Sequence, residues 1–373
     1  MIRALTIFGT RPEAIKLAPV VRALRARSRA FDCRVCVSAQ HRAMLDQVLG
    51  TFDLAADYDL DLMTPNQSPA QVVARVMERL PPLLAEARPD VVIVQGDTMT
   101  TFAASFAAYL SKIPSAHVEA GLRTGDRFQP FPEEMNRVLT SRIATLHFPP
   151  TAMARDHLLA EGISSEDVVV TGNTVIDALL QTVRKDYRFR HPRLADLDPQ
   201  RRLVLVTTHR RESFGDPLRA TCAAIVELAR RFPDLDFVLP VHPNPQVKST
   251  VEELLGGVRA VRLVEPLDYV ELVHVMARAV IVLTDSGGIQ EEAPSLGKPV
   301  LVLREVTERP EGVTAGTAIV VGTNRERIVA EASSLLTDAA RYESMARAVN
   351  PYGDGHASER IADALERRYG KRP

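Results

Sequence analysis

The chain has 373 residues, of which 46% are hydrophobic and 25% charged, with a formal net charge of −1 and an isoelectric point near 6.8. A chain of this length and composition can bury two sizeable cores, so two domains are expected. The lack of a basic excess disfavours nucleic acid as a partner, and no apolar run approaches the roughly 20 residues that span a bilayer. We therefore expect a soluble, cytoplasmic protein that binds neither nucleic acid nor membrane.

Short β-branched runs alternate with longer amphipathic ones, which is typical of βα units on a parallel sheet. In the first half, strands are expected at residues 3–8, 33–39, 90–95, 115–120, 145–148 and 167–172. In the second half they are expected at residues 202–208, 236–241, 260–265, 279–285, 298–303 and 317–322. The pattern predicts the α/β class, with two doubly wound, Rossmann-like domains whose strand ends face a cleft.

The domain boundary is expected where the apolar periodicity stops. The segment KDYRFRHPRLADLDPQRR is polar and contains two prolines, so a linker is placed at residues 185–201. The N-terminal domain then covers residues 1–184 and the C-terminal domain residues 202–356. A last segment, residues 357–373, begins with an expected helix that no strand follows, and it is a candidate to pack where the domains meet.

Chemically active residues follow the expected strands of the first half. GTRPEAIK places the cations Arg11 and Lys16 at the start of a helix, after a glycine turn and a proline at a first helical position. A cation there opposes the helix dipole unless an anion lies nearby, and the planar fork of Arg11 matches phosphate or carboxylate. An ordinary surface arginine is an equally good interpretation of this motif alone.

Three carboxylates also occur at or soon after strand ends. Asp97 follows VIVQG, Glu119 follows SAHV, and Glu133 opens the expected helix of FPEEMNR beside Glu134. Because open α/β folds bind ligands at the carboxyl edge of the sheet, we interpret Asp97 and Glu119 as proton-transfer groups rather than structural ones. Glu133 and Glu134 are equally suited to stabilising a helix dipole.

In the second half, THRRESFG and TDSGGIQEE follow two expected strands. The first motif puts His209 at a strand end, where it is a plausible phosphate contact. In the second, Ser286, Gly287 and Gly288 open a helix whose unpaired N–H groups suit an anion. The chain has neither a G-x-G-x-x-G turn nor a Walker lysine, which disfavours NAD and ATP, and its three cysteines suggest no metal site.

Ten motifs between Phe8 and Gly355 resemble those of the bacterial non-hydrolysing UDP-N-acetylglucosamine 2-epimerases, among them FGTRPEAIK, VQGDTMTT, HVEAGLRTGD, PFPEEMNR, THRRESFG and DSGGIQEEAPSLGKPVLVLR. The resemblance implies a glycosyltransferase-B-type fold, usually a homodimer, and no cofactor. It also implies interconversion of UDP-GlcNAc and UDP-ManNAc by elimination of UDP to 2-acetamidoglucal and re-addition. The product would supply envelope or capsule polysaccharide.

The resemblance also implies roles for individual residues. The catalytic group comprises Asp97, Glu119, Glu133 and His209, the last holding the departing diphosphate. The substrate-binding group comprises Arg11, Lys16, Arg137, Ser286, Gly287, Gly288 and Glu292, and by helix rise and side-chain tilt Glu292 could reach a ribose beside the phosphates. Some members bind a second, activating nucleotide sugar, and the residues that match parts of that position are Gln40, Gln67, Arg210 and His242.

The chain departs from the family pattern at Leu272, where many members have an aromatic residue against uracil, and at Thr208 and Gln95. Three other functions remain open. A glycosyltransferase would share the fold but would not need three carboxylates in the first domain. A nucleotide-sugar sensor would keep DSGGIQEE without them, and a hydrolysing epimerase would release free ManNAc.

Overall fold

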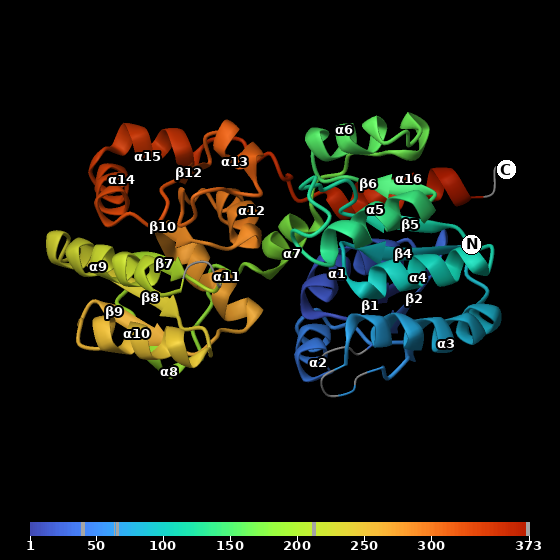
Figure 1. Cartoon of the computed structure of the whole chain (residues 1–373), viewed down its shortest axis with the longest axis horizontal. Coiled ribbons are helices and arrows are strands. Elements are labelled where there is room, and N and C mark those ends of the chain that lie inside the picture. Colours follow the sequence, from blue (N-terminus) through green and yellow to red (C-terminus); the bar gives the residue numbers. More distant parts are fainter. Residues whose placement is uncertain (39–41, 63, 65–66, 211–213, 371–373) are drawn as a thin grey trace. The chain divides into compact units, whose positions relative to one another are not determined.

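The computed structural model describes residues 1–38, 42–62, 64, 67–210 and 214–370 (Figure 1). It divides into two compact units. The first comprises Met1–Leu180 together with the segment from Tyr352 onward, and the second comprises Gln181–Pro351. The chain therefore enters the second unit once and returns to the first for its last helix.

The first unit contains a six-stranded parallel sheet in the order β3-β2-β1-β4-β5-β6. Its strands are β1 (Ile2–Phe8), β2 (Phe31–Val37), β3 (Tyr58–Asp59), β4 (Val91–Gln95), β5 (Ser115–Val118) and β6 (Leu146–Phe148). Its helices are α1 (Arg11–Ala26), α2 (Arg42–Thr51), α3 (Pro69–Ala87), α4 (Met99–Leu110), α5 (Glu133–Ile143), α6 (Ala152–Ala160), α7 (Thr174–Thr182), which runs into the second unit, and α16 (Ala357–Tyr369). All five residues of β4, VVIVQ, are buried, as expected for a central strand covered on both faces.

The second unit contains another six-stranded parallel sheet, in the order β12-β11-β10-β7-β8-β9. Its strands are β7 (Arg202–Thr207), β8 (Leu235–Pro240), β9 (Val261–Val264), β10 (Ala279–Thr284), β11 (Val300–Val302) and β12 (Ala318–Val320). Its helices are α8 (Pro192–Ala195), α9 (Asp216–Arg231), α10 (Pro245–Leu255), α11 (Tyr269–Arg278), α12 (Gly287–Ser295), α13 (Pro310–Thr314), α14 (Arg325–Thr337) and α15 (Ala339–Ala346).

Counted from its own first strand, each sheet has the order 3-2-1-4-5-6, which is that of a dinucleotide-binding Rossmann fold. The predicted fold class is therefore confirmed. The order reverses between β1 and β4 in the first unit and between β7 and β10 in the second. Ligands of such folds bind outside the carboxyl ends of the strands at this switch point, so the loops after these four strands are the places to look for a site.

The last helix is fixed to the first unit by its amino end. Asp177 on α7 accepts hydrogen bonds from the backbone N–H of Ser358, at 2.7 Å, and of Ala357, at 3.2 Å. The Ser358 hydroxyl also donates to Asp177. A carboxylate satisfies the unpaired N–H groups at a helix start, so this contact stabilises α16 where it packs against α1.

The secondary structure differs from the expectation at two places in the first sheet. Residues 167–172 were expected as a strand, but only Val168 pairs, in a single bridge to His147, after a 3-10 turn at Ser165–Asp167. The chain then turns at Gly172, whose φ is +89° and where a Cβ would lie 3.2 Å from Gly353. The sixth place in the sheet is taken instead by the two-residue strand β3.

None of the helices in the described part of the chain is both long and apolar enough to cross a bilayer.

Candidate functional site

The loops after β1 and β4 are joined by a buried carboxylate that the sequence analysis did not single out. Glu13 accepts hydrogen bonds from the backbone N–H of Gly9 and Thr10 at 3.1 and 2.8 Å. From the other loop it accepts the hydroxyls of Thr98 and Thr101 at 2.8 and 3.2 Å. The turn that carries Arg11 and the turn that carries Asp97 are thus fixed to each other at the switch point.

Arg11 is the first residue of α1 and is half-buried. Within the described ranges its guanidinium forms no hydrogen bond or ion pair. An arginine held beside a helix start without an anionic partner can bind one from solution.

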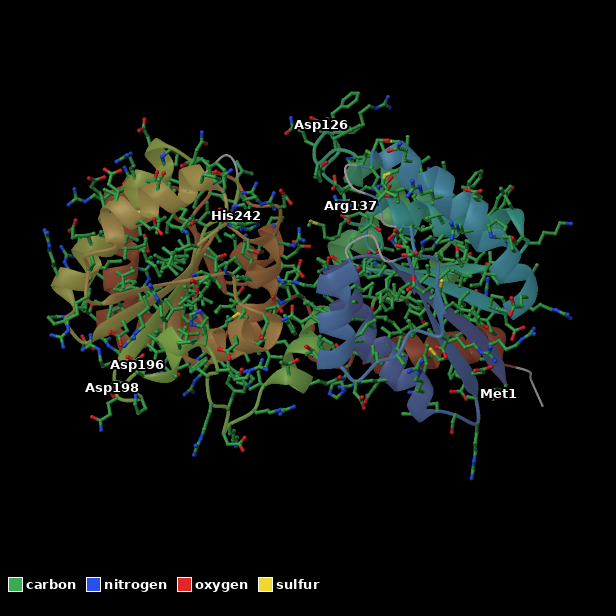
Figure 2. The ribbon with its side chains drawn as sticks, turned by 90° about the horizontal axis from the view of Figure 1, so that it is seen from below. Met1, Asp126, Arg137, Asp196, Asp198 and His242 are labelled. Atoms are coloured by element: carbon green, nitrogen blue, oxygen red, sulfur yellow. The ribbon has the colours of Figure 1, made fainter. Side chains whose placement is uncertain are left out.

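Asp97 is held by two residues of α5. Its carboxylate accepts from Arg137 Nη2 at 2.6 Å and Nε at 3.0 Å, and its backbone carbonyl accepts from Asn136 Nδ2 at 2.8 Å. Arg137, labelled in Figure 2, also lies 3.2 Å from Glu134, which accepts from the backbone N–H of Thr124. Glu134 therefore orients Arg137, and Arg137 orients the Asp97 carboxylate.

Glu119 lies at the end of β5 in an unusual backbone conformation, with φ of +62°. A residue with a side chain adopts this conformation at some cost in free energy, and such residues concentrate at functional sites. Its carboxylate is almost buried and accepts from Lys16 Nζ at 2.5 Å and from Gln95 Nε2. Gln95, one of the departures from the family pattern, thus supplies a neutral donor to the carboxylate.

A buried histidine lies behind these groups. His117 Nε2 is 2.7 Å from the carbonyl of Gly96, the residue before Asp97. Burial lowers the pKa of His117 to about 3, so its ring is neutral at physiological pH and donates from Nε2 to the carbonyl. The ring therefore supports the Gly96 turn without adding charge to it.

Glu133 begins α5 and is half-buried. In contrast to Asp97 and Glu119, it has no hydrogen-bonding or ion-pair partner in the part of the chain that the structure describes. The structure thus links two predicted carboxylates to predicted cations, Asp97 to Arg137 and Glu119 to Lys16, and leaves the third carboxylate available.

In the second unit, a buried aspartate orients His209. Asp285 follows β10, is fully buried, and lies 2.7 Å from Nδ1 of His209, which follows β7. It also accepts the backbone N–H groups of His209 and Arg210, each at 2.9 Å. Burial alone would raise the pKa of Asp285, but the hydrogen bond and charge of His209 and the two amides outweigh it and lower that pKa. With Nδ1 facing Asp285, Nε2 of the half-exposed ring is left for a ligand.

The start of α12 has the expected form of an anion site except at Ser286, whose backbone N–H donates to the Thr284 hydroxyl at 2.9 Å. Ser286 is the N-cap residue but makes no side-chain cap bond, and the helix begins at Gly287. A Cβ on Gly288 would lie 3.9 Å from Oε2 of Glu292, which shows that the Glu292 carboxylate turns back toward the helix start. Glu292 is almost buried and accepts from the hydroxyl of Tyr269 at 3.1 Å. Amide donors and a carboxylate acceptor therefore lie within one turn of helix.

Glu291 differs from Glu292 although the two are adjacent. Its carboxylate pairs with Nε of Arg309, and its side chain is 2% exposed. The guanidinium carbon of Arg309 would lie 3.7 Å from a Cβ on Gly287, so this cation stands beside the open end of α12. Sequence spacing did not identify Arg309 because it reaches the helix from a loop 18 residues further along the chain.

The four residues matched to a second nucleotide-sugar position do not form one cluster in either unit. Gln40 lies outside the described residues. Gln67 belongs to the first unit and accepts from the Thr64 hydroxyl at 3.3 Å. In the second unit, Arg210 lies 3.5 Å from Glu308, and Nδ1 of His242 accepts the backbone N–H of Asn244 at 3.2 Å. Their role stays a prediction.

Within the described residues, no group of three or more histidine, cysteine, aspartate or glutamate side chains could hold a metal ion. The residues that sequence reasoning missed, chiefly Glu13, Asp285 and Tyr269, act on other residues through hydrogen bonds. For Asp285 a signal existed, since it ends an apolar strand directly before the Ser286 turn.

Known proteins are similar to this chain along nearly its whole length. The sequence profile of a family described as "UDP-N-acetylglucosamine 2-epimerase" matches residues 22–366. The UDP-N-acetylglucosamine 2-epimerase of Escherichia coli (strain K12) is 52% identical over 371 residues, which are 98% of this chain and 98% of that protein. These matches include residues of both units.

Two solved structures are similar over the same extent. The UDP-GlcNAc 2-epimerase from Neisseria meningitidis bound to UDP-GlcNAc is 46% identical with a TM-score of 0.89, covering 98% of this chain and 100% of that one. The S. aureus MnaA-UDP co-structure is 45% identical with a TM-score of 0.88, covering 98% and 96%.

Proposed function

The chain belongs to the UDP-N-acetylglucosamine 2-epimerase family, and on that premise we propose that it interconverts UDP-GlcNAc and UDP-ManNAc without releasing the free sugar. In this proposal the second unit binds the UDP part of the substrate. The diphosphate accepts from the amides at the start of α12 and from Nε2 of His209, and Glu292 accepts from the ribose hydroxyls. The turned-back carboxylate of Glu292 beside Gly288 supports this assignment.

The carboxylates of the first unit are assigned to the sugar. The bond between C1 and the UDP oxygen breaks first and leaves an oxocarbenium-like centre that acidifies C2. One of the carboxylates then removes the proton at C2, which gives 2-acetamidoglucal and UDP. UDP then re-adds at C1 while a carboxylic acid returns a proton to the opposite face of C2. No electrons are gained or lost overall, so inversion at C2 needs no oxidant or reductant.

The contacts of the three carboxylates are the observation that carries the proposal. Asp97 and Glu119 each lie against a cation, Arg137 and Lys16, which fixes the direction in which the carboxylate points. Glu133 has no cation within the described residues and is free to exchange a proton with a substrate. A transferase or a sensor would have no use for all three. Arg11 is assigned to the phosphate, where it would stabilise the charge that develops on departing UDP.

The decisive experiment follows UDP-GlcNAc by NMR in heavy water with the purified chain and no additive. We expect UDP-ManNAc with deuterium at C2. Free ManNAc with UDP would indicate the hydrolysing reaction, and an unchanged substrate would indicate a transferase that lacks its acceptor or a sensor. UDP-ManNAc that kept its hydrogen at C2 would overturn the elimination route.

We also propose that the enzyme is a homodimer and that its product serves the synthesis of envelope or capsule polysaccharide. Two exposed aromatic side chains in the first unit support the dimer, because a partner subunit could cover them. Phe128 and Phe131 are 68% and 67% exposed and stack on each other. Sedimentation of the purified chain tests the dimer, and a monomer at micromolar concentration would contradict it.

A further inference from the structure

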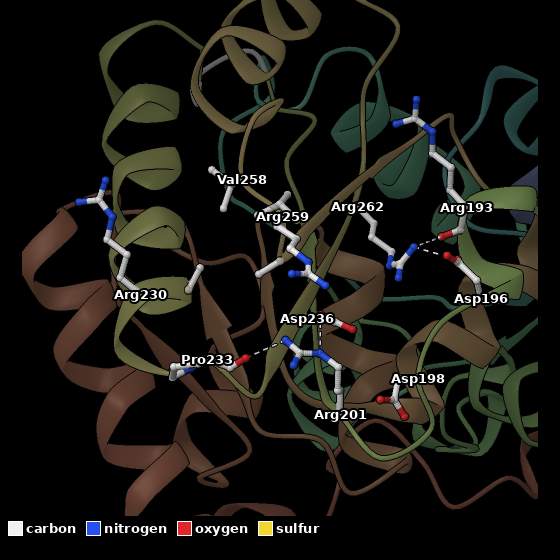
Figure 3. A pocket seen from close by; sticks show the side chains of 13 residues that line it. Arg193, Asp196, Asp198, Arg201, Arg230, Pro233, Asp236, Val258, Arg259 and Arg262 are labelled. Atoms are coloured by element: carbon white, nitrogen blue, oxygen red, sulfur yellow. Dashed lines mark hydrogen bonds and ion pairs between the residues drawn. The ribbon is translucent and has the colours of Figure 1, made fainter.

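A polar pocket of about 980 Å³ lies in the second unit, away from the candidate site (Figure 3). Its walls come from α8 and the loop after it, the end of α9, the start of β8 and the turn before β9. Arg201, which lines it, directly precedes β7, whereas His209 follows the same strand. The pocket therefore opens at the amino edge of the sheet, and the predicted site lies at the carboxyl edge.

Arginine dominates the charges of this pocket. The charged side chains that line it are Arg193, Arg201, Arg230, Arg259, Arg262, Asp196, Asp198 and Asp236. Positive charges outnumber negative ones by two, in a chain whose overall charge is close to zero. A local positive excess inside a concave surface raises the local concentration of anions.

Two of these guanidinium groups are held in place by the aspartates. Arg201 donates from Nε to Asp236 at 2.9 Å and from Nη2 to the carbonyl of Pro233 at 2.8 Å. Arg262 donates from Nη1 to Asp196 at 2.8 Å. These bonds leave Nη1 of Arg201, and Nε and Nη2 of Arg262, without a partner among the described residues. The two cations are thus oriented while part of each donor fork stays open.

A third guanidinium completes the arrangement. Arg259 is exposed and makes no hydrogen bond or ion pair with any residue that the structure describes. Figure 3 shows Arg201, Arg259 and Arg262 directed toward the same part of the pocket, whereas Arg230 is directed away from it. Three converging cations repel one another unless an anion lies among them, and planar forks match the oxygens of a phosphate group.

We propose that this pocket binds a phosphorylated small molecule that carries hydroxyl groups, such as a sugar phosphate. Its volume is that of a ligand pocket and far exceeds the space that a phosphate ion fills. The rest of the wall offers apolar surface from Ala229, Val258 and Ala260, together with the carboxylate of Asp198 as an acceptor for hydroxyl groups. The arginines bind the phosphate, and this wall accommodates the organic part.

The test is calorimetric titration of the whole chain with glucose 6-phosphate, inorganic phosphate and glucose, with and without saturating UDP. In the proposed function UDP occupies the candidate site, so the heat of binding that remains in the presence of UDP comes from the pocket. The variant is Arg259→Gln and the matched control is Arg230→Gln, since both remove one exposed positive charge from the rim of the same pocket. Circular dichroism spectra of the two variants are compared with that of the unaltered chain to check that both are folded.

We expect saturable binding of glucose 6-phosphate that UDP does not displace, weaker binding of inorganic phosphate, and none of glucose. Arg259→Gln should weaken binding about tenfold or more, because charge-assisted hydrogen bonds are lost, and Arg230→Gln should change it little. Equal loss in the two variants, displacement by UDP, or no saturable binding would overturn the proposal. If inorganic phosphate binds as tightly as the sugar phosphate, the claim that the pocket wall also binds the sugar is wrong.

Discussion

The two units share a strand order and a buried carboxylate at the switch point, but the groups at their strand ends differ. In each, a buried carboxylate joins the loops after the first and fourth strands. In the first unit it is Glu13, in the first turn of α1, and its described donors are hydroxyls and amides. In the second it is Asp285, in the loop after the fourth strand, and one of its partners is His209. The same topology thus presents carboxylates on one sheet and a histidine with the amides of a helix start on the other.

This difference shows that topology fixes where a ligand site forms and that residue identity at the strand ends decides what the site does. Burial raises the pKa of Glu13, which has no cation among its described partners. Asp285 is also buried, yet His209 and two amides lower its pKa. In the proposed function, the first unit accordingly supplies the acid and base groups, and the second supplies donors for the diphosphate.

The largest expected effect tests the carboxylates of the first unit. Glu133→Gln removes a carboxyl group without breaking an ion pair within the described residues. Turnover of UDP-GlcNAc should fall by roughly 10² to 10⁴, since that is the usual loss when a general acid or base is removed. UDP affinity, measured by calorimetry, should stay unchanged because Glu133 is assigned to the sugar and not to UDP.

The control is Glu86→Gln, which removes an exposed carboxylate from α3 in the same unit and should leave turnover unchanged. Normal turnover by the Glu133 variant would remove this residue from the acid–base group. The corresponding Asp97→Asn and Glu119→Gln changes also break ion pairs with Arg137 and Lys16, so Glu133→Gln is the cleaner variant.

The second effect concerns two hydrogen-bond donors at corresponding places, since Arg11 and His209 each follow the first strand of their unit. Replacing either with alanine should weaken UDP binding by about 1.5 to 3 kcal/mol, the usual strength of hydrogen bonds to charged groups. Calorimetric titration with UDP measures this, and Arg29→Ala, at an exposed arginine of the first unit, is the control. If only His209→Ala weakens binding, the diphosphate is held by the second unit alone and the role of Arg11 is wrong.

Much of this architecture could be predicted from the sequence because it depends on local patterns. Runs such as VVIVQ and AVIVLT located the central strands, and the rise of a helix per residue brought Glu292 back toward Gly288. The two-residue strand β3 was missed because so short a segment carries no periodicity. Residues 167–172 were predicted wrongly as a strand, because their β-branched run does not reveal the turn that Gly172 makes against Gly353.

The supporting residues of the site could not be predicted because their partners are far away in the sequence. Glu13 bonds residues 85 and 88 positions further along, and Asp285 bonds backbone groups 75 and 76 positions earlier. Nothing in a local window shows such a contact. The resemblance identified residues that were expected to touch substrate, and the structure adds those that orient them.

A smaller effect separates binding from stability at the start of α12. Gly288→Ala would place its Cβ 3.9 Å from Glu292 and Ser286, which is ordinary contact, so the fold should accept it. Alanine favours a helix over glycine by about 0.8 to 1 kcal/mol in helix interiors, so the melting temperature should hold or rise. UDP affinity should fall because the methyl group occupies the space next to the amides. A variant with reduced stability and unchanged UDP affinity would contradict the anion site.

The smallest effect is a pair of opposite pH dependences that follow from the two buried carboxylates. The lowered pKa of Asp285 means that the unfolded chain binds a proton more readily than the folded chain does. Its stabilisation is therefore present above the usual aspartate pKa, about 3.9, and is lost as the pH falls through the lowered folded value. The raised pKa of Glu13 has the opposite sign, so the folded state gains stability relative to the unfolded state as the pH falls through the raised value.

Asp285→Asn and Glu13→Gln each remove one of these groups, and urea midpoints at pH 7 and at about pH 3.5 compare them with the unaltered chain. The loss of unfolding free energy that Asp285→Asn causes should shrink on acidification, because the unaltered chain then loses the stabilisation that the variant already lacks. The deficit of Glu13→Gln should grow, because protonation relieves the unaltered chain of a buried charge that the variant never carried. Deficits that move in the same direction would show that the two units do not differ in the way their buried carboxylates are compensated.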